Sequence, residues 1–266
     1  MQTDDWAWVE EVDDAWVPPP MDTSKPSTAR IYNYALGGKD HYLVDREVAG
    51  RVLAVNPEGR EAARANRQFM VRVVRSMAES GIRQFIDLGT GIPISPNLHE
   101  TAWAVEPGAR IVYVDNDPVV LAHNRAFLRA EPRVAVLAHD LRDPAAVLAD
   151  PQVHGLLDLT RPVGLLMVCV LHFVDVAAAP RIVNRYLRDL PPGSQVAIST
   201  ATSLGLDPAI VRRMVAAYGR GTGATLTFRT EAEVQALFDG LEMVEPIADV
   251  HRSPGGALLG GVGVKR

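Results

Sequence analysis

The fold class follows from one stretch of the chain, Arg83-Gln-Phe-Ile-Asp-Leu-Gly-Thr-Gly-Ile-Pro-Ile-Ser-Pro96. Its apolar run at 85–88 stops at Gly89-Thr-Gly91, a pattern typical of a buried strand that ends in a tight turn. Ser95-Pro96 predicts the N-cap and the first turn of a helix that follows the glycines. The stretch therefore predicts a strand, a glycine turn and a helix.

The two glycines indicate a turn that a ligand can approach closely. Gly89 and Gly91 permit backbone conformations that a side chain would forbid. A turn of this kind before a helix offers free N–H groups to an anion or a polar ligand. The full dinucleotide-binding fingerprint has a third glycine at the position of Ile94, so a pyrophosphate pressed against the helix end is not favoured.

A second strand and an acidic motif follow. Residues 109–114 form a β-branched and aromatic run, and Asp115-Asn116-Asp117-Pro118 comes directly after it. Asp115 then lies at the carboxyl end of a parallel strand, 26 residues after Gly89, where a carboxylate can accept both hydroxyls of a ribose. Asp117 and Pro118 predict the N-cap and first residue of the next helix. We therefore expect Asp115 to contact a ligand and Asp117 to have a structural role.

These motifs resemble those of class I S-adenosylmethionine-dependent methyltransferases. The resemblance rests on Asp87-Leu-Gly-Thr-Gly91, on Asp115 after its strand, and on His139-Asp140-Leu141 after a third strand at 134–138. It is closer to one bacterial family, long described as a domain of unknown function and now as S-adenosyl methyltransferase. The motifs shared with that family are Ala29–Asp40, Ala65–Arg67 and Tyr113–Val119, and the resemblance covers about residues 28 to 264.

The resemblance implies a fold, a cofactor and a set of binding residues. It implies an α/β, doubly wound, mostly parallel seven-stranded Rossmann-like sheet with an N-terminal helical lid, and S-adenosylmethionine as the cofactor. By resemblance, the methionine portion would be lined by Asp87, Gly89, Thr90 and Gly91, the ribose by Asp115, and the adenine by Asn116, Asp140 and the backbone N–H of Leu141. Lys39, Asn66 and Arg67 are further candidates for cofactor binding.

Two N-terminal features leave alternatives open. Gly37-Gly38 predicts the end of a helix, and the polar run Lys39–Tyr42 follows it. This run is either a solvated loop or part of a hinged lid that faces a ligand, and the resemblance favours the lid. On the long helix predicted for 57–80, Arg67 either meets a carboxylate, such as the methionine end of the cofactor, or faces solvent.

The fourth predicted strand leads to the candidate catalytic residue. Residues 163–171 are almost continuously apolar, which is typical of a strand buried on both faces of a parallel sheet. Cys169 lies inside this run, so we expect a buried small hydrophobic residue. His172 follows at the strand end and is the candidate general base, because an imidazole of pKa near 6.5 accepts a proton at neutral pH. A histidine satisfied by local hydrogen bonds is the alternative.

The remaining pattern completes the sheet. Further strands are predicted at 195–200, 241–244 and 257–264, with 246–256 as a loop. We expect an acidic flexible tail at 1–27 and a single domain at 28–266, made of N-terminal helices (28–80) and an α/β core (81–266). The tail either has no fixed structure or docks on a partner.

Composition narrows the class of partner. Net charge is −5, and because residues 1–24 contain seven acids and no Lys or Arg, the rest of the chain carries about +2. Without clustered basic residues no nucleic-acid partner is expected. The seven histidines are dispersed and HExxH is absent, so no metal site is expected. No signal peptide and no membrane span are predicted, which favours a cytoplasmic protein.

These observations predict an S-adenosylmethionine-dependent methyltransferase that acts on a small molecule. A non-catalytic regulatory protein that binds S-adenosylmethionine is one alternative. An NAD-dependent oxidoreductase is the less favoured one, because the third glycine of its fingerprint is missing. The sequence leaves the oligomeric state and the acceptor open.

Overall fold

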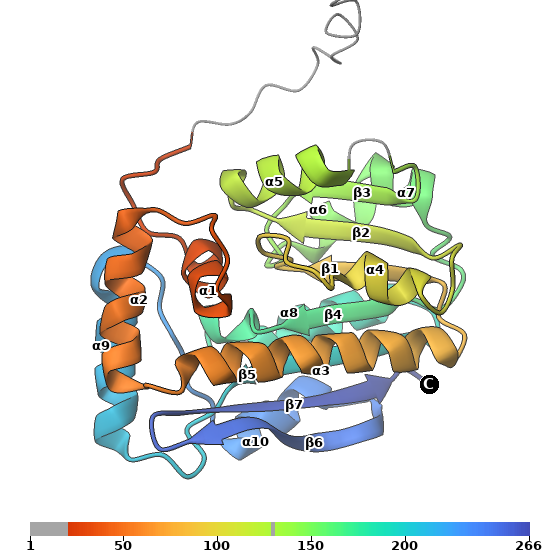
Figure 1. Cartoon of the computed structure of the whole chain (residues 1–266). Coiled ribbons are helices and arrows are strands. Elements are labelled where there is room, and N and C mark those ends of the chain that lie inside the picture. Colours follow the sequence, from red (N-terminus) through yellow and green to blue (C-terminus); the bar gives the residue numbers. More distant parts are fainter. Residues whose placement is uncertain (1–20, 129–130) are drawn as a thin grey trace, which may run out of the picture.

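The structure, a computed structural model, describes residues 21–128 and 131–266 (Figure 1). Most of the predicted acidic tail lies outside the described residues. The described part contains one seven-stranded sheet, in the order β3-β2-β1-β4-β5-β7-β6. Its strands are β1 (Gln84–Leu88), β2 (Arg110–Asp115), β3 (Val134–Ala138), β4 (Gly164–Val168), β5 (Gln195–Ala201), β6 (Glu242–Ser253) and β7 (Gly256–Val264).

The sheet is mixed. Strands β3, β2, β1, β4 and β5 pair in parallel, whereas β7 is antiparallel to both β5 and β6. The expected strand and helix alternation is therefore present, with an antiparallel hairpin at one edge. Leu165 and Leu166 of β4 are both completely buried although they point to opposite faces, as a central strand covered on both sides requires.

Helices cover both faces of the sheet and its strand ends. The helices are α1 (Thr28–Leu36), α2 (Leu43–Val55), α3 (Gly59–Glu79), α4 (Leu98–Trp103), α5 (Pro118–Leu128), α6 (Pro144–Ala149), α7 (Pro151–Leu156), α8 (Ala179–Asp189), α9 (Pro208–Thr222) and α10 (Glu231–Gln235), with short 3-10 turns η2 (Leu171–Phe173) and η3 (Ala236–Phe238). Apolar residues of α3, α4 and α5 pack on one face of the sheet, and those of α6, α7, α8 and α10 pack on the other. The core is therefore two apolar layers separated by the sheet.

A third apolar cluster joins the N-terminal helices to α9. Ile31 of α1 and Val48 of α2 pack with Tyr218 of α9 in this cluster. A buried ion pair with 2.8 Å between Arg30 Nε and Asp45 Oδ2 ties α1 to α2. Figure 1 shows α1, α2 and α9 together beyond one end of the sheet. These three helices build a wall beside the ends of the parallel strands.

Two sequence predictions about element ends are wrong. Helix α4 begins at Leu98, after the N-cap Asn97, whose N–H donates to the Glu100 carboxylate at 2.7 Å. Ser95-Pro96 belongs to the preceding loop, because Asn97 and Glu100 form a capping box that defines the helix start. Strand β4 ends at Val168, three residues before the end of the apolar run.

The predicted loop at 246–256 is also wrong, because β6 continues to Ser253. Strand β6 lies at the sheet edge, and its register with β7 shifts between Glu245 and Ala248. Pro246 lies within this shift. Proline has no N–H to donate, so it is tolerated in a strand at an edge or a bulge, and its presence does not exclude one.

Candidate active site

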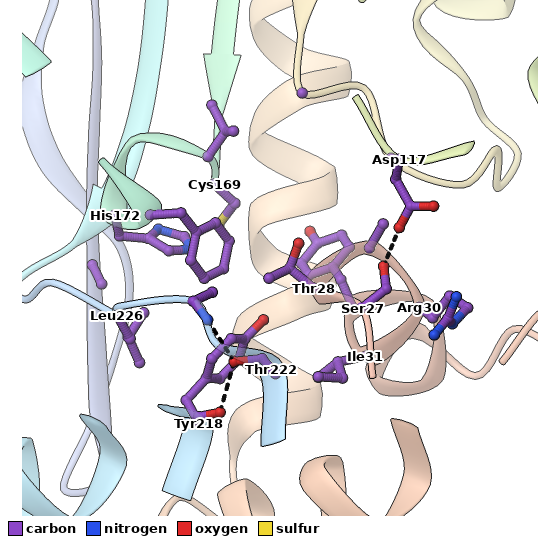
Figure 2. Close-up of a pocket in the computed structure, with 18 of the residues that line it drawn as sticks. Ser27, Thr28, Arg30, Ile31, Asp117, Cys169, His172, Tyr218, Thr222 and Leu226 are labelled. Atoms are coloured by element: carbon purple, nitrogen blue, oxygen red, sulfur yellow. Dashed lines mark hydrogen bonds between the residues drawn. The ribbon is translucent and has the colours of Figure 1, made fainter. Parts of the chain in front are cut away.

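A cavity of about 1020 Å³ lies at the carboxyl ends of β1, β2 and β4 (Figure 2). The glycine turn after β1, the acidic motif after β2 and the segment after β4 form one side of it. Helix α1 and the segment that follows α9 form the other. Parallel strands place their carboxyl ends at one edge of a sheet, and this edge is where open α/β sheets bind ligands.

The glycine turn folds back onto the end of β2. Gly89 and Gly91 adopt φ values of +74° and +68°. A Cβ on Gly89 would lie 2.4 Å from the Val170 side chain, so this position also requires glycine for close packing, whereas a Cβ on Gly91 would meet nothing within 4 Å. The N–H groups of Gly89 and Thr90 donate to Val114 O at 2.9 and 3.2 Å.

This arrangement corrects the expectation of free N–H groups for an anion. The Gly91 N–H donates to Asp115 Oδ2 at 2.9 Å, so all three amides of the turn have partners within the protein. The turn therefore brings open space and carboxylates to the cavity rather than an anion-binding nest.

Two partly buried carboxylates face the cavity from adjacent strands. Burial raises the pKa of Asp87 to about 6, although a hydrogen bond from the Thr90 side chain opposes the shift. Burial also raises the pKa of Asp115 to about 6, opposed by the N–H groups of Asp117 and Gly91. Among the described side chains neither carboxylate has an ion-pair partner. A cationic ligand would therefore stabilise both as anions.

The motif after β3 lies beside them. Asn116 Nδ2 donates to Asp140 Oδ2 at 3.2 Å, and Arg142 Nε donates to Asp140 Oδ1 at 2.9 Å. The Arg142 guanidinium lowers the pKa of Asp140, which keeps this carboxylate charged. Leu141 also lines the cavity. The structure thus brings Asn116, Asp140 and Leu141 together with the two buried carboxylates.

Asp117 has the structural role that the sequence predicts, and a second contact as well. Its Oδ1 accepts the Val119 N–H at 2.8 Å at the start of α5. Its Oδ2 accepts a hydrogen bond from the Ser27 hydroxyl, just before α1 (Figure 2). The acidic motif after β2 is therefore joined directly to the N-terminal segment.

The three N-terminal candidates differ in where they lie. Asn66 is buried at the cavity wall, where its Oδ1 accepts from Ser199 Oγ at 2.6 Å and its Nδ2 donates to Tyr32 Oη at 2.9 Å. Arg67 lines the cavity and donates to the Pro96 carbonyl at 2.9 Å, so it holds the loop after the glycine turn. Lys39 is exposed and does not line the cavity.

Residues just before and within α1 approach the cavity in place of the polar run. Gly37 ends α1 with φ +85°, and the chain then continues into α2 along the outer side. Ser27, Thr28 and Ile31 line the cavity, whereas Lys39–Tyr42 do not. Sequence reasoning missed this because the helical period of α1 does not say which of its faces is turned to the sheet.

Cys169 is a wall of the cavity and not a core residue. It follows β4 with φ +55°, and its N–H donates to Ser199 O at 3.0 Å. Burial raises the pKa of its thiol to about 12, so it is neutral at pH 7. The apolar run at 163–171 is nine residues long, whereas the neighbouring strand β1 has only five residues. This difference in length is the signal in the sequence that part of the run lies beyond the end of its strand.

His172 also lines the cavity, in the η2 turn. Its ring packs on Phe173 with 4.3 Å between the ring centroids, and Nδ1 is buried with no hydrogen-bond partner among the described residues. Burial and the nearby Arg229 lower its pKa to about 3. A local hydrogen bond does not satisfy the ring, and the low pKa makes it a weak base.

The site fits a ligand with a positive charge and hydroxyl groups. The carboxylates of Asp87 and Asp115 are partly buried and have no ion-pair partner within the described residues, so they favour a cation and can accept from a ribose. The occupied amides of the turn disfavour a pyrophosphate. S-adenosylmethionine has this chemistry, because it combines a sulfonium, an ammonium and a ribose. No cluster of His, Cys, Asp or Glu suited to a metal occurs within the described ranges.

Comparisons with known proteins agree with this chemistry. The family described as S-adenosyl methyltransferase matches residues 14–253. A DUF574 family protein from Streptomyces avermitilis is 42% identical, with a TM-score of 0.87 over 93% of this chain and 100% of that one. A putative methyltransferase from Thermobifida fusca is 37% identical, with a TM-score of 0.87 over 95% and 99% of the two chains.

More distant structures share the fold alone. The N-methyltransferase NodS from Bradyrhizobium japonicum, solved with S-adenosyl-L-homocysteine, is 13% identical, with a TM-score of 0.50 over 89% of this chain and 98% of that one. No curated protein gives a significant match. None of the helices in residues 21–128 and 131–266 combines the length and apolar character of a membrane span.

The chain belongs to the S-adenosyl methyltransferase family and is an enzyme whose cofactor is S-adenosylmethionine.

Proposed function

We propose that this enzyme transfers a methyl group from S-adenosylmethionine to a small-molecule acceptor inside the cavity. The observation that carries the proposal is the pair of partly buried carboxylates, Asp87 and Asp115, which have no ion-pair partner among the described residues and lie at the edge of a cavity of about 1020 Å³. The cofactor supplies an activated methyl group on a positively charged sulfur. A cavity of this size has room for the cofactor and a compact acceptor.

Each predicted cofactor residue would contact a different part of S-adenosylmethionine. Asp115 would accept the ribose hydroxyls, and Asp87 would face the charged methionine portion, with Gly91 leaving room for it. Asn116 and Asp140, already held together, would meet the adenine edge. Arg67 would support the loop after the glycine turn and lower the local negative potential near Asp87.

The N-terminal helices would act as a lid on a single domain. Residues 28–80 would cover the cofactor and 81–266 would form the core. The contacts of Ile31 with the cavity and of Ser27 with Asp117 support this arrangement. A cover of this kind would align the acceptor with the methyl group, and alignment is the main requirement of an in-line displacement.

His172 would be a wall of the acceptor site more than a base. A pKa of about 3 leaves it neutral at pH 7 and costly to protonate. The acceptor atom would then lose any proton to water, or would carry none. The scarcity of clustered basic residues supports a small acceptor over a nucleic acid, and we also propose a cytoplasmic location.

Calorimetry with purified protein tests the proposal. We expect S-adenosylmethionine to bind and NAD not to bind, and we expect Asp115→Asn to weaken the binding at least tenfold. Asp158→Asn is the matched control, because Asp158 is exposed and does not line the cavity. Tight binding of NAD, or equal effects of the two substitutions, would contradict the assignment. Formation of S-adenosylhomocysteine with added acceptors separates catalysis from regulatory binding.

A further inference from the structure

The end of the cavity away from Asp117 has a distinct lining. We call it the aromatic chamber and define it by Ile31, Phe173, Tyr218, Leu226 and Phe228, all of which line the cavity. They come from α1, η2, α9 and the segment after α9, and pack in one apolar cluster. Figure 2 shows Tyr218, Leu226 and His172 on one side of the cavity and Asp117 with Ser27 on the other.

The chamber has flat walls. The rings of Phe173 and Tyr218 lie 5.4 Å apart at an interplanar angle of 33°, and His172 meets Phe173 edge-on. Rings at this spacing pack against each other, so a planar guest can stack on the outer face of one of them. The chamber therefore selects for shape as well as for apolar character.

Three titratable side chains at the chamber, Tyr218, Cys169 and His172, are neutral at pH 7. Burial raises the pKa of the Tyr218 phenol and of the Cys169 thiol, and lowers that of His172. The nearby charges of Arg30 and Asp45 are paired with each other at 2.8 Å. A charged guest would lose its hydration here without gaining a partner, which is unfavourable.

Asp175, an exposed residue, also lines the cavity. Arg229 is a nearby charge that argues for an anionic guest. It is completely buried and influences His172, but it does not line the cavity. Its Nη2 donates to Val174 O at 2.9 Å and its Nη1 to Thr200 Oγ1 at 3.4 Å. These contacts tie η2 to β5, so we assign Arg229 a structural role and include an anionic probe in the test below.

Two polar groups remain for a guest. The Tyr218 hydroxyl and the His172 ring have no hydrogen-bond partner within the described part of the chain. Both residues are more than nine-tenths buried, and His172 Nδ1 is itself a buried atom without a partner there. Buried polar groups are normally satisfied, so these two point to a ligand or to water at this place.

We infer that the methyl acceptor is an uncharged, planar, largely apolar ring compound that occupies the aromatic chamber and hydrogen-bonds to Tyr218 Oη and to His172. This inference rests on the proposed function. In the transfer, a lone pair on the acceptor atom forms the bond to the methyl carbon, and the carbon–sulfur bond breaks with its electron pair left on sulfur. Any proton on the acceptor atom leaves to water.

Three probes that share one ring system and differ in charge test the inference that the acceptor is uncharged. The neutral probe is 2-naphthol, the anion is 2-naphthoate and the cation is 2-naphthylmethylammonium, each titrated into the full chain with and without S-adenosylhomocysteine. We expect 2-naphthol to bind at least tenfold more tightly than either ion. Equal or tighter binding of an ion, or binding of none of the three, would overturn the inference.

A conservative substitution tests the hydrogen bond. Tyr218→Phe should weaken 2-naphthol about fivefold, the usual loss for one neutral hydrogen bond, and leave naphthalene unchanged. Tyr34→Phe is the matched control, because Tyr34 packs in the same cluster but does not line the cavity. Equal weakening by both substitutions, or none by Tyr218→Phe, would remove Tyr218 from the acceptor site.

The two proposals fail in different ways. Binding of 2-naphthol without binding of S-adenosylhomocysteine would support the chamber and contradict the proposed cofactor site. Binding of S-adenosylhomocysteine without binding of any naphthalene probe would support the cofactor site and overturn the inferred acceptor.

Discussion

Asp115 joins ligand binding to the local structure of the turn. It accepts the Gly91 and Asp117 N–H groups, each at 2.9 Å, and still faces the cavity. Asp115→Ala should weaken S-adenosylmethionine by roughly 1–3 kcal/mol, because the ribose hydroxyls lose a charged acceptor. Asp117→Ala should mainly lower the free energy of unfolding, by about 1 kcal/mol, through the lost cap of α5. Calorimetry and urea denaturation measure the two effects.

Ser27→Ala serves as the control for this pair. It removes the hydroxyl that donates to Asp117 and leaves the cap of α5 in place. If Asp115→Ala and Asp117→Ala weakened the binding of S-adenosylmethionine equally, the assignment of ligand binding to Asp115 and of helix capping to Asp117 would be wrong.

Cofactor affinity should depend on pH through Asp87 and Asp115. With a pKa of about 6, each is about one-tenth ionised at pH 5, so affinity for the cationic cofactor should fall at least about tenfold between pH 7 and pH 5. Asp87→Asn should reduce this dependence. Calorimetry at both pH values measures it, and an affinity that rises towards pH 5 would contradict the roles of both acids.

The same shifts affect the stability of the cofactor-free protein in the opposite direction. The pKa of each carboxyl is higher in the folded chain than the usual 3.8, so the folded state binds more protons in this range. The contribution of the two groups to stability is therefore greatest below about pH 4 and is lost as pH rises through about 6.

His172 should remain neutral throughout the range in which an ordinary histidine titrates. Its pKa of about 3 follows from burial and from Arg229. NMR titration of ring resonances, assigned by their loss in His172→Asn, should show no protonation of His172 above about pH 5. A titration near 6.5 would show that the imidazole is hydrated and would restore it as a candidate base.

At the scale of elements, Asn66 connects three of them. Its side chain joins Tyr32 of α1 to Ser199 of β5, and Ser199 Oγ in turn accepts the Cys169 N–H at 3.0 Å. Asn66→Ala should lower the free energy of unfolding by roughly 1–3 kcal/mol, because buried partners on both sides lose a hydrogen bond. Urea denaturation measures the change.

Arg64→Ala on the same helix is the matched control. Arg64 is exposed, and its ion pair with Glu61 is exposed as well, so its loss should change stability by less than about 1 kcal/mol. An Asn66→Ala protein as stable as this control would mean that water replaces the amide in the network.

At the scale of the whole molecule, cofactor binding should tighten α1 against the core. The segment Ser27–Ile31 borders the cavity and contacts Asp117 through Ser27. Hydrogen exchange of the α1 amides should slow when S-adenosylmethionine binds, while α8, which packs on the sheet face away from α3, should change little. Equal exchange of α1 with and without the cofactor would contradict the proposed lid.

Much of the core could be predicted from local pattern. The β1 strand, the glycine turn, β2 and the placement of Asp115 and Asp117 depend on hydrophobic periodicity, on turn chemistry and on helix caps. These act over a few residues, so a sequence window contains their causes. The same locality explains the capping box of Thr230 and Glu233 at the start of α10.

The sequence alone determined the parallel core, the glycine turn and the acids at the strand ends, because each follows from neighbouring residues. Only the tertiary structure decided that Ser27 and Ile31 reach the cavity while Lys39 does not, that Cys169 leaves β4 beside Ser199, and that α1 and α9 together enclose an aromatic chamber. These features arise from contacts between segments far apart in the chain. Their geometry depends on how whole helices pack on the sheet, and a short stretch of sequence does not predict that packing.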